Sequence, residues 1–72
     1  MTLADLVRMA NQIAANFAHH PPEQASTEVA AHLKAFWAPT MRNELLADTN
    51  LDELDPIVVA ALELLRESAL PK

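Results

Sequence analysis

Two residue types are missing from the sequence altogether: it contains no cysteine and no glycine. Without cysteine, the chain cannot form disulfides, thiolate nucleophiles, cysteine-ligated zinc sites or iron–sulfur clusters of its own. Without glycine, it lacks the tight backbone approach on which Walker A loops and dinucleotide fingerprints depend. We therefore expect no covalent cross-link and no nucleotide chemistry in this chain.

Basic residues are also few, with five lysines and arginines against ten aspartates and glutamates and a net charge of -5 at pH 7. The basic residues are scattered, whereas phosphate backbones are bound by clustered lysine and arginine. The longest apolar run is Ile57 to Leu62, far short of the roughly 20 residues that a bilayer span needs. Asp5 and Arg8 interrupt a signal-like start. We expect a soluble, cytoplasmic protein that binds neither nucleic acid nor membrane.

The chain is short, and its 72 residues are expected to form one helical domain, residues 1–72. A core below roughly 80 residues rarely supplies more than ~3–5 kcal/mol of stability, so such domains usually need a covalent staple or a partner. Hydrophobic residues make up 51% of the sequence, which is too many for a disordered tail and more than a lone domain of this size needs. The surplus indicates burial against another surface.

Apolar residues spaced three and four positions apart predict a first helix from Thr2 to Ala18, with Thr2 as N-cap and Asp5 completing a capping box. Prolines mark later helix starts, because proline loses no hydrogen bond at the first helical position. The other expected elements are a helix from Pro22 that ends near Pro39, a short helix from Pro39 to Ala47, a polar break at 48–50, a loose turn at 51–54 and a helix from Pro56 to about Ala69. The sequence shows no strand-like alternation. It predicts an all-α fold, a small antiparallel helical bundle of three main helices plus one short helix.

The last helix carries apolar residues over an arc of roughly 200°, about twice the stripe that a surface helix needs. Asp55 is its expected N-cap. The stripe expected to face the domain consists of Val58, Leu62, Leu65 and Ala69. The stripe left for a second surface consists of Ile57, Ala60 and Leu64. This second stripe favours a protein interface, although a tight bundle can also bury both stripes.

The titratable residues form no recognisable catalytic or metal-binding pattern. His19 and His20 precede a proline pair with no carboxylate at ligand spacing, which favours solvated histidines at a helix end. His32 lies four residues from both Glu28 and Phe36, which favours a Glu–His pair on the flank of a helix. Acidic pairs fall in polar stretches where nothing separates their pKa values. The sequence therefore indicates no catalytic, cofactor-binding or metal-binding residue.

Two neighbouring aromatic residues, Phe36 and Trp37, are expected near the end of the second helix, in a buried stripe with Val29 and Leu33. Neighbours on a helix cannot both point fully inward, so one large ring is expected near the edge of the core. Aromatic and arginine side chains are frequent at the centres of protein interfaces. Phe36 and Trp37 therefore act either as core residues or as interface residues, and Arg8 and Arg42 either keep the surface soluble or bind a partner.

Two segments carry a resemblance to a known family. The residues of the first are Leu6, Val7, Arg8, Met9, Ala10, Asn11 and Ile13. The residues of the second are His32, Leu33, Phe36, Trp37, Pro39, Met41 and Arg42. In this combination, and over nearly its whole length, the sequence resembles the delta subunit of the soluble NAD-dependent formate dehydrogenases that carry molybdenum or tungsten.

The resemblance implies a non-catalytic accessory subunit that stabilises the active complex or assists its assembly. The implied partners are the alpha (catalytic) subunit and, through it, the beta and gamma subunits. The cofactors implied for those other subunits are bis-molybdopterin guanine dinucleotide, iron–sulfur clusters, FMN and NAD, and none is implied for this chain.

The residues that we expect at the partner interface are Arg8, Phe36, Trp37, Pro39, Met41, Arg42, Ile57 and Leu64. An alternative hypothesis is a homodimeric helical protein without an enzyme partner, in which two copies bury the second stripe of the last helix. A third is a small enzyme, which requires turnover by the purified chain alone.

Overall fold

The computed structural model describes residues 2–47 and 51–69, and within these ranges the chain is helical, with no strand. The helices are α1 (Leu3–Asn16), α2 (Pro22–Phe36), α3 (Pro39–Leu46) and α4 (Pro56–Ala69), and the 3-10 turn η1 (Leu51–Glu53) precedes α4. The predicted all-α fold class is confirmed, and the helices start and end close to the predicted residues. The polar break expected at 48–50 lies outside the described residues.

The helix starts follow the predicted capping chemistry. At α1, the Asp5 backbone N–H donates to Thr2 Oγ1 at 3.2 Å, and the Thr2 N–H donates to Asp5 Oδ2 at 3.1 Å, which completes the capping box. At α4, the Ile57 N–H donates to Asp55 Oδ1 at 2.9 Å. Helices α2 and α3 begin at Pro22 and Pro39, where a missing N–H costs no intrahelical hydrogen bond.

The capping box predicts that part of the domain's stability depends on the ionisation of Asp5. The Thr2 backbone and side chain, and then the Arg8 charge, hold the pKa of Asp5 below its ordinary value of 3.8. A carboxylate with a depressed folded-state pKa contributes stability above its unfolded pKa and loses it as the pH falls through the folded value. We expect the free energy of unfolding, measured in urea, to fall more for the wild type than for Asp5→Asn between about pH 5 and about pH 2.5.

The control for this titration is Glu63→Gln, which removes an exposed carboxylate on α4. The Glu63→Gln variant is expected to lose as much stability as the wild type does over the same pH range. Equal losses in the wild type and in Asp5→Asn would show that the capping box does not contribute.

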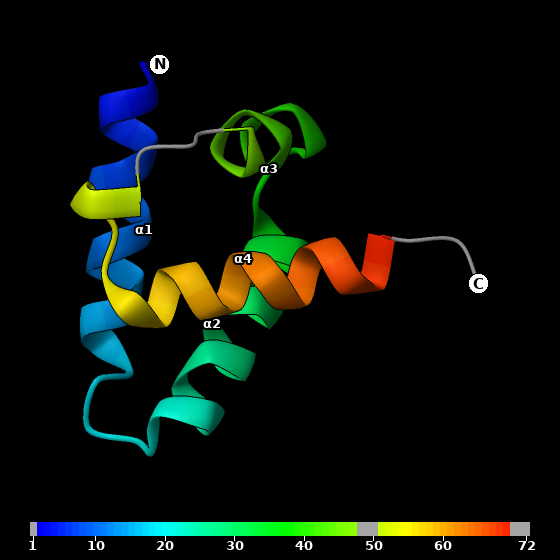
Figure 1. Cartoon of the computed structure of the whole chain (residues 1–72). Helices are drawn as coiled ribbons and strands as arrows, with labels where there is room; N and C mark the ends of the chain where they lie inside the picture. Colours follow the sequence, from blue (N-terminus) through cyan, green and yellow to red (C-terminus); the bar gives the residue numbers. More distant parts are fainter. Residues whose placement is uncertain (1, 48–50, 70–72) are drawn as a thin grey trace.

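The helices cross one another around a single apolar cluster (Figure 1). Helix α2 makes its most extensive contact with α4, which lies across it. The fully buried large side chains of the core are Leu6, Val29, Leu33, Leu45, Val58 and Leu62. The predicted antiparallel bundle is not confirmed, since Figure 1 shows α4 starting beside α1, running away from it and lying across α2. A side-chain clamp on the turn before α4, described below, holds the start of α4 against the side of α1.

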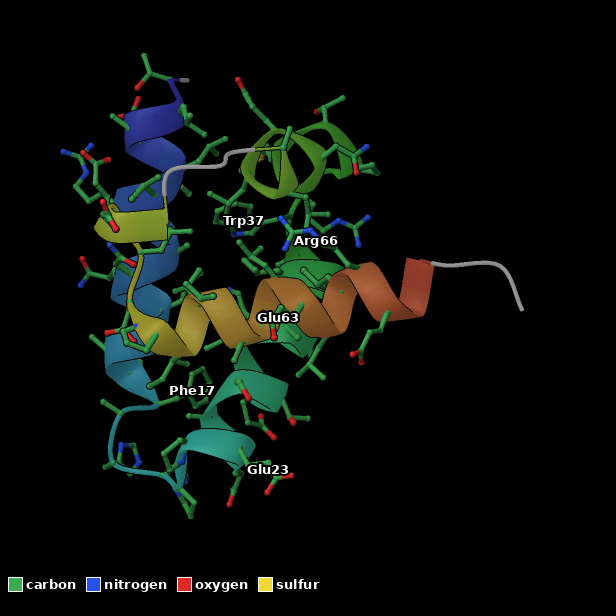
Figure 2. All side chains as sticks on the ribbon, in the orientation of Figure 1. Phe17, Glu23, Trp37, Glu63 and Arg66 are labelled. Atoms are coloured by element: carbon green, nitrogen blue, oxygen red, sulfur yellow. The ribbon has the colours of Figure 1, made fainter. Side chains whose placement is uncertain are left out.

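The core confirms part of the predicted burial pattern and corrects one residue of it. Val58, Leu62 and Leu65 of α4 are buried as expected, and Ala69 has no described side chain. Of the two neighbouring aromatics, Trp37 is 7% exposed and Phe36 is 76% exposed. Phe36 was therefore wrongly expected in the buried stripe of α2. The chain leaves its helical path after Phe36, and this turn lets Trp37 point into the space between α1 and α3 (Figure 2).

Candidate functional site

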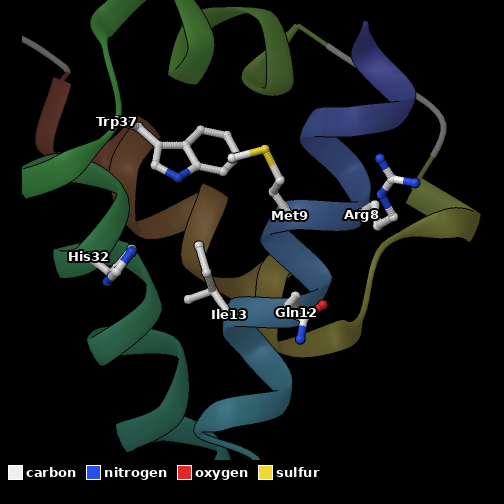
Figure 3. Close-up of a pocket in the computed structure, with 6 residues that line it drawn as sticks. All are labelled: Arg8, Met9, Gln12, Ile13, His32 and Trp37. Atoms are coloured by element: carbon white, nitrogen blue, oxygen red, sulfur yellow. The ribbon is translucent and has the colours of Figure 1, made fainter. Parts of the chain in front are cut away.

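The described part of the chain contains an open pocket of about 360 Å³ between α1 and the end of α2 (Figure 3). Its lining residues are Arg8, Met9, Gln12, Ile13, His32 and Trp37. The residues from α1 lie on adjacent turns of one helix face, because Gln12 follows Arg8, and Ile13 follows Met9, by four positions. His32 comes from α2, and Trp37 is the C-cap residue of that helix. The pocket is of the size that binds small molecules or inserted side chains.

The wall of the pocket is apolar, and its polar groups are mainly hydrogen-bond donors. Figure 3 shows the Met9 thioether reaching toward the indole ring of Trp37, with Ile13 below them. The indole nitrogen of Trp37 faces the pocket on the side of His32 and Ile13, and its N–H has no hydrogen-bond acceptor among the described residues. None of the lining residues is acidic. The pocket therefore suits an apolar group that carries an acceptor.

Arg8 brings a positive charge to the α1 edge of the pocket. Its Nη2 atom lies 2.9 Å from Asp5 Oδ1, in an ion pair whose Arg8 side chain is 78% exposed. Exposed pairs of this kind contribute about 0–1 kcal/mol. A carboxylate from a partner can therefore compete for this guanidinium group at little cost.

Phe36 extends the apolar surface beyond the pocket. Its ring packs against the imidazole of His32, with 4.9 Å between the ring centroids. The expected pair of His32 with Glu28 is not among the ion pairs of the described residues. Since His32 also lines the pocket, the exposed ring of Phe36 and the pocket form one continuous surface.

Asn11 is the residue that fixes the start of α4 against α1. Its Nδ2 amide donates to the Glu53 carbonyl oxygen at 2.8 Å, and its Oδ1 accepts from the Asp55 backbone N–H, also at 2.8 Å. The side chain thus clamps both sides of the turn that leads into α4. Asp55 in turn caps that helix, so one amide anchors to α1 the turn at which α4 begins.

Replacement of Asn11 by alanine is expected to destabilise the domain by about 1–3 kcal/mol, because it leaves polar backbone groups of a partly buried turn without partners. The measurement is urea unfolding monitored by helical circular dichroism. The matched control is Asn16→Ala at the exposed end of the same helix, which is expected to cost little. Equal stability of the two variants would contradict the clamp.

Two arginines connect α3 to its neighbouring helices. Arg66 of α4 donates from Nη2 to the Leu46 carbonyl oxygen at 2.6 Å, at the C-terminal end of α3, and Figure 2 shows its side chain directed toward α3. Arg42 Nη1 lies 3.5 Å from the Lys34 carbonyl oxygen. The Nε atom of Arg42 is buried without a partner in the described structure. These contacts give both arginines a structural role in orienting α3.

The residues expected at a partner interface do not lie at one place. Arg8 and Trp37 line the pocket, and Phe36 adjoins it through His32. The expected residues on or at α3 are Pro39, Met41 and Arg42, of which Pro39 is exposed and the other two are half-buried. On α4, Ile57 is half-buried against the core and Leu64 is 37% exposed.

The sequence interpretation missed the pocket residues Met9, Gln12, Ile13 and His32 as site residues. Their signal in the sequence is weak: the four-residue spacing of Arg8 with Gln12, and of Met9 with Ile13, marks the polar edge of an apolar stripe. Such an edge becomes a pocket only when a second helix lies beside it. The spacing alone does not show where the second helix lies.

The histidine pair lies in the turn after α1, with 4.1 Å between the ring centroids of His19 and His20. Among the residues that the structure describes, no group of three or more histidine, aspartate or glutamate side chains is placed to hold a metal ion. In the same residues, no helix is both long and apolar enough to cross a bilayer.

Comparison with known families gave a match over most of the chain. The family described as "NADH-dependant formate dehydrogenase delta subunit FdsD" matches residues 5–62. The match begins in the first turn of α1 and ends within α4, so it includes every residue of the pocket. Neither the curated proteins nor the solved structures gave a match.

Proposed function

The chain belongs to the family of NADH-dependent formate dehydrogenase delta subunits, since the family match spans most of its length. On that basis we propose that it is a non-catalytic accessory subunit of a cytoplasmic NAD-dependent formate dehydrogenase. In this proposal it binds the alpha subunit and stabilises the assembled complex or assists its assembly. The observation that carries the proposal is the family match over residues 5–62.

The proposed mechanism is burial of apolar surface that the isolated chain leaves exposed. Phe36 is 76% exposed and adjoins the pocket through His32. A large exposed ring beside a pocket is a typical centre of a protein interface. A subunit that binds only the folded, assembled partner stabilises that state by mass action. The chain therefore acts without any reaction chemistry of its own.

The cofactors belong to the other subunits in this proposal. The alpha subunit holds the bis-molybdopterin guanine dinucleotide with molybdenum or tungsten and the iron–sulfur clusters, and the beta and gamma subunits use FMN and NAD. The delta chain contributes to catalysis only by increasing the amount of intact complex.

The charge of α4 argues against the homodimer as the main function. Leu64, from the second apolar stripe, lies beside the exposed carboxylates of Glu63 and Glu67. In a symmetric dimer both copies bring the same patch to the interface, so each copy would bury these acidic side chains against an equally acidic surface. Ile57 of the same stripe already packs against the core, which leaves little apolar area for self-association.

The experiment is a pull-down of the tagged, full-length chain from its native cells, with mass spectrometry and a formate-dependent NAD reduction assay on the eluate. We expect recovery of the large formate dehydrogenase subunits together with that activity. Light scattering on the purified chain is the companion measurement. A stable dimer recovered without any formate dehydrogenase subunit would overturn the proposal.

A further inference from the structure

The pocket between α1 and α2 is the strongest unassigned binding feature of the chain. From its shape and chemistry we infer that it receives a short segment of the partner subunit, in which an apolar side chain enters the pocket beside an aspartate or glutamate. This inference rests on the proposed function and adds to it the site and the chemistry of the segment that docks there.

The first observation is a donor without a protein partner that faces the open pocket. Trp37 is more than nine-tenths buried, and its indole N–H has no acceptor among the described residues. Figure 3 shows the indole nitrogen directed into the pocket. A largely buried tryptophan normally pairs its indole N–H with a protein acceptor or with water. The position next to Trp37 is therefore one where an oxygen atom of a bound group gains a hydrogen bond.

The second observation is the sign of the charge around the pocket. The chain as a whole carries -5, yet the pocket is lined by Arg8 and by no carboxylate. Asp5 occupies one nitrogen of the Arg8 guanidinium group, and the other donors of this planar group remain for a second carboxylate. This charge complementarity favours an acidic residue next to the apolar one.

The third observation is the extent of the surface, which favours a polypeptide over a small molecule. Met9 and Ile13 provide an apolar wall inside the pocket, and the exposed ring of Phe36 continues it past His32. A compact ligand fills a pocket but does not cover an adjoining ring. A segment with successive side chains does both, as peptides do in hydrophobic grooves on helical proteins.

The binding test uses the full-length chain and the remaining formate dehydrogenase subunits prepared without it. Trp37→Phe keeps an aromatic ring and removes the N–H donor, and Arg8→Gln removes the charge from an exposed side chain. We expect each to raise the Kd by about tenfold or more, since a hydrogen bond to a charged group is lost. The matched control is Lys34→Gln, which removes an exposed positive charge outside the pocket and is expected to leave the Kd within about twofold.

Circular dichroism of each variant shows whether the fold is retained. If Trp37→Phe does not fold, Arg8→Gln still tests the pocket, because its side chain is exposed. A Kd that is unchanged in Arg8→Gln, or raised equally in Lys34→Gln, would overturn the inference.

A cross-linking test identifies the segment, because the chain has no cysteine of its own. Ala35→Cys places a single thiol on an exposed position of α2, one turn from His32. A photo-crosslinker on this thiol is expected to attach to a partner peptide that contains an apolar residue next to Asp or Glu. The control thiol is Glu63→Cys on α4. Attachment only from Glu63→Cys, or to peptides without an acidic residue, would overturn the inference.

The outcomes separate this inference from the proposed function. If the wild-type chain binds the other subunits and the pocket variants bind equally well, the accessory role stands and the pocket inference fails. If the wild-type chain does not bind them at all, the proposed function fails and the inference fails with it.

Discussion

Replacement of Leu33 by alanine is expected to lower the free energy of unfolding by about 2–5 kcal/mol. Leu33 is 0% exposed and belongs to the core cluster where α2 and α4 pack together. The substitution removes buried methyl groups and leaves a cavity that rigid neighbours fill only in part. A domain of this size rarely has more than ~3–5 kcal/mol in total. We therefore expect a large fraction of the isolated variant to be unfolded.

The measurement is urea unfolding of the isolated chain at low temperature, followed by circular dichroism. The matched control is Leu64→Ala on α4, where the same atoms are removed from a side chain that is 37% exposed. Its cost is expected to be well below that of Leu33→Ala, since less apolar area returns to water. Similar costs for the two variants would mean that the core is not centred between α2 and α4.

Replacement of Phe36 by alanine is expected to weaken binding to the other formate dehydrogenase subunits by about thirtyfold while leaving the domain folded. Phe36 is 76% exposed, so its ring contributes little to the core. An aromatic ring at the centre of an interface typically contributes about 2 kcal/mol or more to binding. Alanine is also the best helix former, so α2 keeps its end.

The matched control is Leu3→Ala, which shortens another exposed apolar side chain at the start of α1. Titration of each labelled variant into the delta-free subunits gives the Kd values. We expect Leu3→Ala to bind as the wild type does. A Phe36→Ala variant with wild-type affinity would remove Phe36 from the interface.

The helices could be predicted from the sequence because their signals are local. The capping box of Thr2 and Asp5 acts over three residues, and Asp55 caps α4 through the second residue after it. Pro22 and Pro39 start helices by the fixed geometry of proline. Each of these helix-start signals involves residues within one helical turn of one another, so a short stretch of sequence is sufficient to recognise it.

The place where α4 starts beside α1 could not be predicted, because the clamp that holds it there is not local. Asn11 binds Glu53 and Asp55, which are 42 and 44 residues away along the chain. In the sequence, Asn11 is one of several polar residues on the outer face of the first helix, and nothing sets it apart. The predicted antiparallel bundle rested on helix order alone, which does not specify crossing directions.

The candidate site was predicted in part. Residue type singles out Arg8, Phe36 and Trp37 in the sequence, and the structure places them at the pocket and its rim. The choice between Phe36 and Trp37 as the buried ring depends on where α2 ends, which sets the direction of Trp37. The pocket itself depends on the distance between α1 and α2, and helical periodicity carries no information about that distance.

The central claim is that this chain raises the amount of intact formate dehydrogenase without contributing to its chemistry. The most direct test is production of the other subunits in the same cells with and without this chain. The assembled complex and the half-life of its formate-dependent NAD reduction on heating are then measured. We predict more complex and a longer half-life with the chain present, and the same KM for formate in both preparations. Equal yield and equal half-life, or a changed KM for formate, would contradict the account.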